Sequence, residues 1–398
     1  HFLRIKYCIS VRFKLMLNSS KESYFKFLKD CRSGDNSFLL TPNSDGSPYA
    51  TCFWVFGMHL LKKTKILSEE NYRLDNIIRN NLYNYRKQIK YDDTKKKPWR
   101  QLLTFSLSAL HVLGTLKHDP LEELIIEVLP EDILLDLNKY GCLTGFPGSG
   151  NDAMFIAIFL IHSEKFLGLN NKHKIDQWVE LHLKNQNKFG FWGEYNNISH
   201  SQFQNGYHQY EIFEYLNVHN PKLKKAADLV FRLMDSDGHF GPYPGGGSCY
   251  DYDAIFILTQ LDNTNQNVKK KIMNKTVKTI LKEQNLDGGF CESCFMWPRN
   301  KSNLFKYVKH VLYTMPNYNL FYERLRLFLS LQQKKYHRIS THWTNYNRLW
   351  NESSLWDSWF RMLAIARIME KFDKKKSDNW GFINYPGIGF NKVFNIKK

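Results

Sequence analysis

The chain repeats a short turn between helical stretches, and its purest copy is Gln186-Asn187-Lys188-Phe189-Gly190-Phe191-Trp192. A second copy is Gln284-Asn285-Leu286-Asp287-Gly288-Gly289-Phe290. A third, Met234-Asp235-Ser236-Asp237-Gly238-His239-Phe240, keeps the glycine and the aromatic residue but lacks the glutamine. A segment that recurs at a regular spacing is typical of a repeat architecture, in which each unit buries its apolar face against the next. This turn therefore decides the fold.

The glycines of these turns set the length of the repeat. Gly190 follows Gly145 by 45 residues, Gly238 follows Gly190 by 48, and Gly288 follows Gly238 by 50. Each period has room for two helices, and apolar residues recur at helical spacing along both. The helix before a turn is amphipathic and the helix after it is mostly apolar, which favours an outer and an inner layer. We therefore predict an all-α fold, an α/α toroid in which about six helix pairs form a double barrel.

The domain organisation expected is simple. Residues 1–20 are predicted to be an N-terminal extension, and residues 21–398 one α/α-toroid domain. The extension is basic and partly apolar but lacks the pattern of a secretory signal. Helices predicted over Val308–Leu312 and Leu320–Leu331, and a last turn at residues 379–382, are assigned to the same series of repeats.

Composition restricts the partners. The net charge of +18 over 398 residues is carried mainly by short lysine clusters outside the apolar pattern. Such a charge attracts diphosphates or acidic membranes, or simply covers a solvated surface. No predicted helix has a continuous basic stripe, which argues against a nucleic-acid partner. Seven scattered cysteines argue against a disulfide framework. No stretch reaches the length of a membrane span. We expect a cytoplasmic protein and leave transient membrane contact open.

The glutamine-to-aromatic turn is similar to the repeat of the terpenoid cyclase and protein prenyltransferase superfamily, in which it holds outer helices to inner ones. The resemblance covers residues from about Asp45 to Trp380. It implies an α/α toroid, an isoprenoid or other small apolar substrate and, for a prenyltransferase, a second subunit. It also implies that the residues of the turns are structural rather than catalytic: Gln186, Trp192, Gln284 and Phe290.

The glycine-rich stretch from Asp237 to Tyr250 resembles a run in prenyltransferase β subunits that precedes an inner helix. In that family the loop lies at the mouth of the central cavity, near the isoprenoid diphosphate. The resemblance implies that Tyr243, Gly245 and Gly246 contact the substrate, because glycines allow close approach of the backbone and supply amide donors.

Asp251-Tyr252-Asp253-Ala254 opens the next helix and is similar to the Asp-x-Asp-Asp signature of class II terpene cyclases. The resemblance implies that Asp253 is the acid that protonates an alkene or epoxide, with Asp251 as its neighbour. The departure is that Ala254 and Ile255 replace an Asp and a Thr of the signature. The alternative is that Asp251 is an N-cap or first-turn residue favoured by the helix dipole.

The same resemblance raises the possibility of a zinc site. Protein prenyltransferases bind zinc with an Asp, a Cys two residues later and a His on a later inner helix. Cys249 matches the Cys, but Gly247 and Asp357 stand where the Asp and the His are expected. Cys249 is therefore only a weak zinc candidate, and Cys291-Glu292-Ser293-Cys294 is a lone CxxC pair. No metal is assigned, and zinc or magnesium stays open as a cofactor.

Further polar and aromatic residues begin other inner helices, whose N-termini are expected to meet at one mouth of the ring. Asp357 is a third catalytic candidate. The substrate-binding candidates outside the glycine-rich stretch are His208, Tyr252, Trp356 and Arg361. Arg361 either reaches a diphosphate or pairs with Asp357 at i, i+4. Repeated capping and ordinary core packing are the alternatives for this set.

Three functions follow. The first is a terpene-cyclase-like enzyme that begins by protonation at Asp253 in an aromatic-lined cavity. The second is a prenyltransferase-like transferase of an isoprenoid diphosphate. The third is a carbohydrate hydrolase or lyase on a double helical barrel, or a non-catalytic binding ring.

Overall fold

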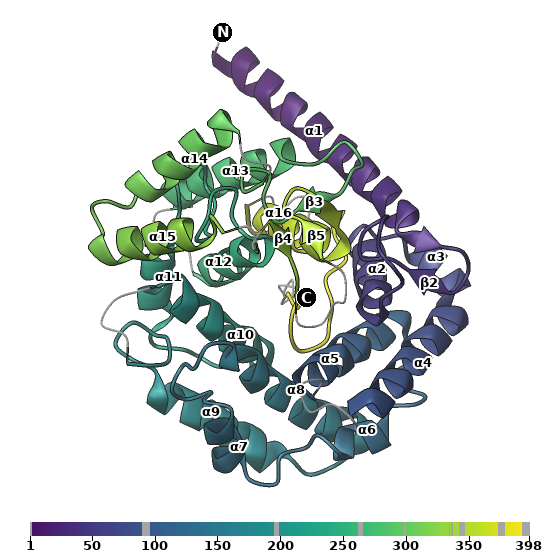
Figure 1. Cartoon of the computed structure of the whole chain (residues 1–398). Coiled ribbons are helices and arrows are strands. Elements are labelled where there is room, and N and C mark those ends of the chain that lie inside the picture. The colour runs from purple at the N-terminus through teal and green to yellow at the C-terminus, as the bar shows by residue number, and fades with distance from the viewer. Residues whose placement is uncertain are drawn as a thin grey trace.

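Inner helices stand side by side around a common axis in the computed structural model (Figure 1). The structure describes residues 2–89, 96–194, 199–261, 266–297, 300–333, 335, 337–341, 347–372 and 379–391. Within them, each inner helix contacts the next, and the last returns to the first. The ring consists of α2 (Pro48–Leu60), α5 (Lys96–Leu113), α8 (Ser149–Leu167), α10 (His200–Leu216), α12 (Ser248–Gln260) and α16 (Leu355–Phe372).

Outer helices surround this ring and run before each inner helix in sequence. They include α1 (Phe2–Asp30), α4 (Asn71–Ile89), α9 (Lys172–Asn185), α11 (Leu223–Leu233) and α13 (Gln266–Lys282). Shorter helices complete the outer layer: α3 (Thr64–Glu69), α6 (Glu122–Ile126) and α7 (Ile133–Lys139).

The division into two layers follows from the sequence pattern. α8 is buried from Ser149 to Ser163 except at Asn151, and a helix that is apolar on all sides has to lie inside a protein. α4 buries only Leu74, Ile78 and Leu82, one stripe at helical spacing. The predicted all-α toroid of paired helices is therefore confirmed. α1 runs unbroken across residue 20, and the predicted division into an extension and a domain stays a prediction.

The repeated turns hold the layers together. Gln186 donates from Nε2 to the carbonyl of Gly190 at 2.9 Å, and Gln284 donates likewise to Gly288 at 2.7 Å. In the copy without a glutamine, Asp235 accepts instead from three successive backbone amides at 2.8–2.9 Å. The turn glycines Gly190, Gly238 and Gly288 have φ of +90°, +98° and +91°, a region that side chains with a Cβ rarely adopt.

Gly288 also sits against α1, which gives a testable difference between two glycines. A Cβ on Gly288 would lie 2.1 Å from the carbonyl oxygen of Ser23, whereas a Cβ on Gly114 meets nothing within 4 Å. Both have positive φ, so Gly114→Ala should cost only the backbone strain, about 1–2 kcal/mol. Gly288→Ala should cost about 2 kcal/mol more, because α1 has to move. Chemical denaturation measures both, and equal losses would contradict the predicted contact.

A helical hairpin interrupts the last repeat. α10 and α12 begin 10 residues after Gly190 and Gly238, but α16 begins 67 residues after Gly288. The intervening segment contains α14 (Lys301–Leu312) and α15 (Tyr318–Ser330), which pack on each other outside the inner ring (Figure 1). The assignment of these two helices to the series of repeats was wrong. The spacing of apolar residues predicts that a segment is helical, but it does not predict in which layer of the toroid the helix lies.

Short strands join the irregular segments in antiparallel pairs. β1 (Arg32–Ser33) pairs with β2 (Ser37–Phe38), β3 (Phe290–Cys291) with β6 (Ser353–Ser354), and β4 (Arg338–Ile339) with β5 (Arg348–Leu349). The β3–β6 pair ties the turn at Gly288 to the start of α16 across the hairpin insertion.

The segment 379–391 closes one end of the ring (Figure 1). Tyr385 places its hydroxyl 2.9 Å from Nδ1 of His162, and Arg367 donates to the carbonyl of Phe390 at 3.1 Å. His162 and Arg367 lie towards the C-terminal ends of α8 and α16. The turn predicted at residues 379–382 is thus the start of a plug, and the N-terminal ends of the inner helices form the opposite mouth.

Candidate functional site

A band of touching aromatic rings crosses the interior beneath this mouth. Neighbouring ring centroids along it are 4.9–6.5 Å apart. Phe105 of α5 also lies 6.0 Å from Trp356 of α16, across the position of α2, so these rings face the interior. Trp356 is partly exposed and the other members are buried. In order, the aromatic band consists of Phe105, Phe53, Trp356, Phe360, Tyr252 and Tyr207.

Asp253 lies beside this band in the second turn of α12. Its side chain is 1% exposed, and neither carboxyl oxygen has a hydrogen-bond partner among the described residues. Burial and the nearby carboxyl groups of Glu211 and Asp251 raise the pKa of Asp253 well above its usual value, and this outweighs the opposite effect of Tyr207. The surroundings of Asp253 therefore favour its protonated, uncharged form.

Glu211 and His208 of α10 extend this buried polar group. Burial raises the pKa of Glu211 well above its usual value, and its Oε1 accepts from the hydroxyl of Tyr252 at 3.4 Å. Burial and then Lys97 lower the pKa of His208 to about 3, so the imidazole is neutral. Its Nδ1 lies 3.5 Å from Oε2 of Glu211. Burial therefore favours the uncharged form of all three groups.

Asp251 differs from Asp253 because both of its carboxyl oxygens have hydrogen-bond or ion-pair partners. Oδ1 accepts from the backbone amide of Phe240 at 2.8 Å, and Oδ2 lies 2.7 Å from Nδ1 of His239 and receives the guanidinium of Arg361. Although burial opposes it, Glu283 and Asp251 raise the pKa of His239 well above its usual value. The position of Asp251 in the first turn of α12 agrees with the alternative of a structural residue.

Arg361 fixes the glycine-rich loop from below. It donates to the carbonyls of Gly245 at 2.6 Å and Gly246 at 3.1 Å, in addition to Asp251. Both glycines are buried and have positive φ. The pairing of Arg361 with Asp357 considered from the sequence was wrong, because Asp357 pairs with Arg348 at 2.6 Å.

A second acidic group lies beside the same mouth. Arg348 donates to Asp357 and also lies 3.4 Å from Glu292, and Tyr243 donates its hydroxyl to Glu292. Burial and the charge of Asp357 raise the pKa of Glu292 to about 8. Burial opposes the effect of Arg348 on Asp357, yet the pKa of Asp357 is lowered. Asp357 also accepts from the hydroxyls of Ser248 and Ser354, each at 2.7 Å.

The residues at the zinc position of the prenyltransferases do not fit a metal. No group of three or more His, Cys, Asp or Glu side chains in the described part of the chain is placed to hold one. The oxygens of Asp357 are taken by Arg348 and two serines. Burial and neighbouring carboxylates raise the pKa of Cys249, which disfavours the thiolate that zinc requires.

The predicted site residues are therefore brought near one mouth but fall into separate groups. One group is the aromatic band with Tyr252 and Trp356, beside which Asp253 and His208 lie next to Tyr207. The second is the loop, in which Arg361 bonds Asp251, Gly245 and Gly246. In the third, Arg348 bonds Asp357 directly and reaches Tyr243 through Glu292. Glu211, Glu292 and Arg348 were not among the predicted site residues. Glu211 follows the predicted His208 by three residues on α10, a helical spacing that could have indicated it. Glu292 and Arg348 lie in the interrupted repeat and carry no local signal.

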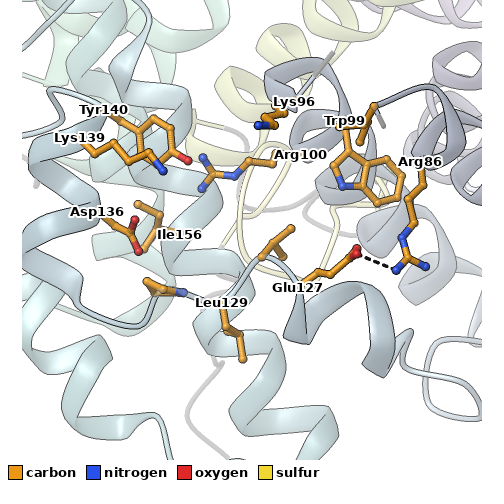
Figure 2. A pocket seen from close by; sticks show the side chains of 13 residues that line it. Arg86, Lys96, Trp99, Arg100, Glu127, Leu129, Asp136, Lys139, Tyr140 and Ile156 are labelled. Carbon is orange, nitrogen blue, oxygen red and sulfur yellow. Dashed lines mark hydrogen bonds and ion pairs between the residues drawn. The ribbon is translucent and has the colours of Figure 1, made fainter. Parts of the chain in front are cut away.

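A separate cavity of about 570 Å³ lies between the outer and inner layers. Figure 2 shows Arg86 paired with Glu127 on one side and Arg100 beside Tyr140 on the other. Arg100 also donates to Asp152 at 3.2 Å. None of the predicted site residues lines this cavity, and its cations are largely balanced by carboxylates.

Comparison with known families identifies a domain in the middle of the chain. Residues 142–296 match the family model of the prenyltransferase alpha-alpha toroid domain. The matched range contains Cys249, Asp251 and Asp253 but ends before Asp357. It confirms the resemblance to the terpenoid cyclase and protein prenyltransferase superfamily, whose enzymes act on isoprenoids. No curated protein and no solved structure matches the chain.

Proposed function

We propose that the protein is a terpene-cyclase-like enzyme that starts its reaction by protonation from Asp253. The observation that carries the proposal is the environment of this carboxyl group: it is almost fully buried, its pKa is strongly raised, and the hydroxyl of Tyr207 lies beside it. An acid that has to protonate an alkene must carry its proton at the working pH, which a raised pKa favours, and must be shielded from water, which would accept the proton instead. The matched toroid domain supports an isoprenoid substrate.

The proposed step begins with the O–H group of Asp253. Its proton forms a new C–H bond with one carbon of a substrate double bond, whose electron pair is consumed, and a tertiary carbocation remains on the other carbon. Ring closure by further double bonds moves the cation along the chain, and loss of a proton ends the reaction, so atoms and charge balance. In this proposal the moving cation is stabilised by the aromatic rings of Tyr207, Tyr252 and Phe360, which contact one another beside Asp253.

Asp251 has a positioning role in this proposal. Because Arg361 and His239 hold its carboxylate, Asp251 fixes the first turn of α12 and keeps a negative charge near Asp253. That charge contributes to the raised pKa of the acid. In this proposal Asp253 is still the acid and Asp251 still assists it, as expected from the sequence. The assistance of Asp251 is electrostatic.

Reaction in heavy water tests the mechanism directly. The enzyme is incubated in D2O with farnesyl diphosphate, geranylgeranyl diphosphate and squalene as separate probes, and products are analysed by mass spectrometry. Protonation by Asp253, whose proton exchanges with solvent, predicts a cyclic product that carries one deuterium at the initiating carbon. A product without deuterium, formed with release of diphosphate, would contradict it and indicate a reaction that starts by loss of diphosphate instead.

A further inference from the structure

The α14–α15 hairpin has an unusually apolar exposed surface. Half of the large hydrophobic side chains that are exposed in the described part of the chain lie in this one insertion. A soluble protein rarely exposes many such residues together unless the surface binds something. They are Leu304, Phe305, Val308, Leu312, Tyr313, Met315, Tyr318, Tyr322 and Leu329.

These residues are ordered along the helices. Leu304, Val308 and Leu312 recur at intervals of four along α14, and Tyr318 and Tyr322 do so at the start of α15. The opposite face of each helix is apolar as well, since Tyr307, Val311 and Leu331 are buried in a cluster with Tyr243 and Trp350. The inward face explains how the hairpin folds, but it leaves the outward stripes without a structural purpose.

The charges around the stripes are almost all positive. Between residues 300 and 335 the sequence contains one acidic residue, Glu323, and this carboxylate lies 2.8 Å from Nδ1 of His200. Basic residues flank the exposed apolar side chains on both helices: Lys301 and Arg326, together with Lys306 and Lys309, which share one carboxylate, Asp237. Apolar and aromatic side chains next to lysines and arginines are the composition of helices that lie in the interface of an acidic bilayer.

An apolar groove lies under the hairpin. Its volume is about 400 Å³, and it lies between α14 and the loop that follows Glu292. Met296 and Trp297 line the groove and belong to the same cluster as Tyr243, whose hydroxyl donates to Glu292 beside the mouth. The outward surface of the hairpin is thus continuous, through apolar side chains, with the edge of the mouth.

We propose that the α14–α15 hairpin docks the protein on a membrane surface that contains acidic lipids. The exposed aromatic and aliphatic residues enter the interfacial region, and the flanking cations contact the headgroups. None of the helices in the described part of the chain is long and apolar enough to cross a bilayer. A second copy of the chain fits less well, because a symmetric interface would bring the same cations together. The docking does not depend on the proposed function.

Vesicle co-sedimentation of the full chain tests the proposal. We expect binding to vesicles of phosphatidylcholine mixed with phosphatidylserine, and weaker binding to phosphatidylcholine alone. The triple variant Phe305→Ser/Leu312→Ser/Tyr322→Ser should lower the apparent partition coefficient at least about tenfold. The matched control Tyr72→Ser/Leu134→Ser/Leu135→Ser, which removes exposed apolar residues elsewhere, should bind like the original protein.

Other outcomes would overturn the docking. Circular dichroism first confirms that both triple variants are folded, which is expected because all six side chains are exposed. Equal loss of binding in the two variants, or no binding to acidic vesicles by the original protein, contradicts a membrane surface at the hairpin. Concentration-dependent self-association that the Phe305→Ser/Leu312→Ser/Tyr322→Ser variant abolishes would assign the same stripes to a second copy instead.

Discussion

Asp253→Asn is expected to abolish turnover while leaving the protein folded. Asparagine has nearly the shape of a protonated aspartic acid but cannot release a proton to an alkene. Loss of a general acid typically costs about 10²–10⁴ in rate, and an initiating acid is expected at the upper end of this range or beyond. The rate is measured with whichever isoprenoid probe the original protein converts, at saturating substrate.

The same substitution should change how stability depends on pH. The pKa of Asp253 is raised in the folded protein, whereas an unfolded Asp has a pKa of about 3.9. Between these two values the folded state binds more protons than the unfolded state, so the free energy of unfolding falls as pH rises. Asp253→Asn removes this contribution. The variant should therefore gain stability relative to the original protein as pH increases above about 4, which denaturation at several pH values measures.

Glu211→Gln is the matched control for this substitution. It also replaces a buried carboxyl with a raised pKa, but it leaves the proposed acid in place. Because Glu211 helps to raise the pKa of Asp253, its removal should shift the loss of activity at high pH towards lower pH without abolishing turnover. Measurable turnover by Asp253→Asn, or equal inactivation by both variants, would remove Asp253 from the role of initiating acid.

Arg361→Met is expected to lower the free energy of unfolding by about 3–5 kcal/mol, because it breaks a buried ion pair by removing one partner. Arg361 is 2% exposed and donates to Asp251 and to the carbonyls of Gly245, Gly246 and Glu292. Its loss leaves a buried carboxylate and three carbonyls without this donor. Chemical denaturation gives the change in stability.

The exposed pairs of the protein supply a control for Arg361. Arg86 binds Glu123 and Glu127 at 2.7 Å each, but both carboxylates are well exposed. Arg86→Met should therefore cost no more than about 1 kcal/mol. Adding Asp251→Asn to Arg361→Met should recover part of the lost stability, since His239 would otherwise face the carboxylates of both Asp251 and Glu283 without the help of Arg361. Equal effects of Arg361→Met and Arg86→Met would mean that the loop is held by other contacts.

The ring and its proposed acid could be predicted because both are local in sequence. The spacing of Gly190, Gly238 and Gly288 reports the repeat, and all three adopt the positive φ that the turn requires. Asp253 could be singled out from four adjacent residues at the start of α12. Its protonation could not, because it depends on Glu211, which comes from another helix and lies nearby only after folding.

The partners of the other polar residues escaped prediction for the same reason. Helical spacing predicts an ion pair between Arg361 and Asp357. In the structure Arg361 pairs with Asp251 on α12, and Asp357 pairs with Arg348. Arg348 lies in the strand β5, after the hairpin insertion that the repeat pattern does not reveal. These ion pairs depend on contacts between segments far apart in the chain, which the spacing of residues in the repeats does not predict.

Closure of the inner ring has a consequence for folding. Each inner helix packs on its successor in the chain, but α2 packs on α16, which lies almost the whole chain away. This seam includes Phe56 and Trp359, whose centroids are 4.9 Å apart, and Phe53 with Trp356 at 5.1 Å. A contact between such distant segments has a large loop-closure entropy and forms late. The aromatic band beside Asp253 is thus completed only when both ends of the ring have been synthesised and joined, because Phe53 and Trp356 meet across this seam.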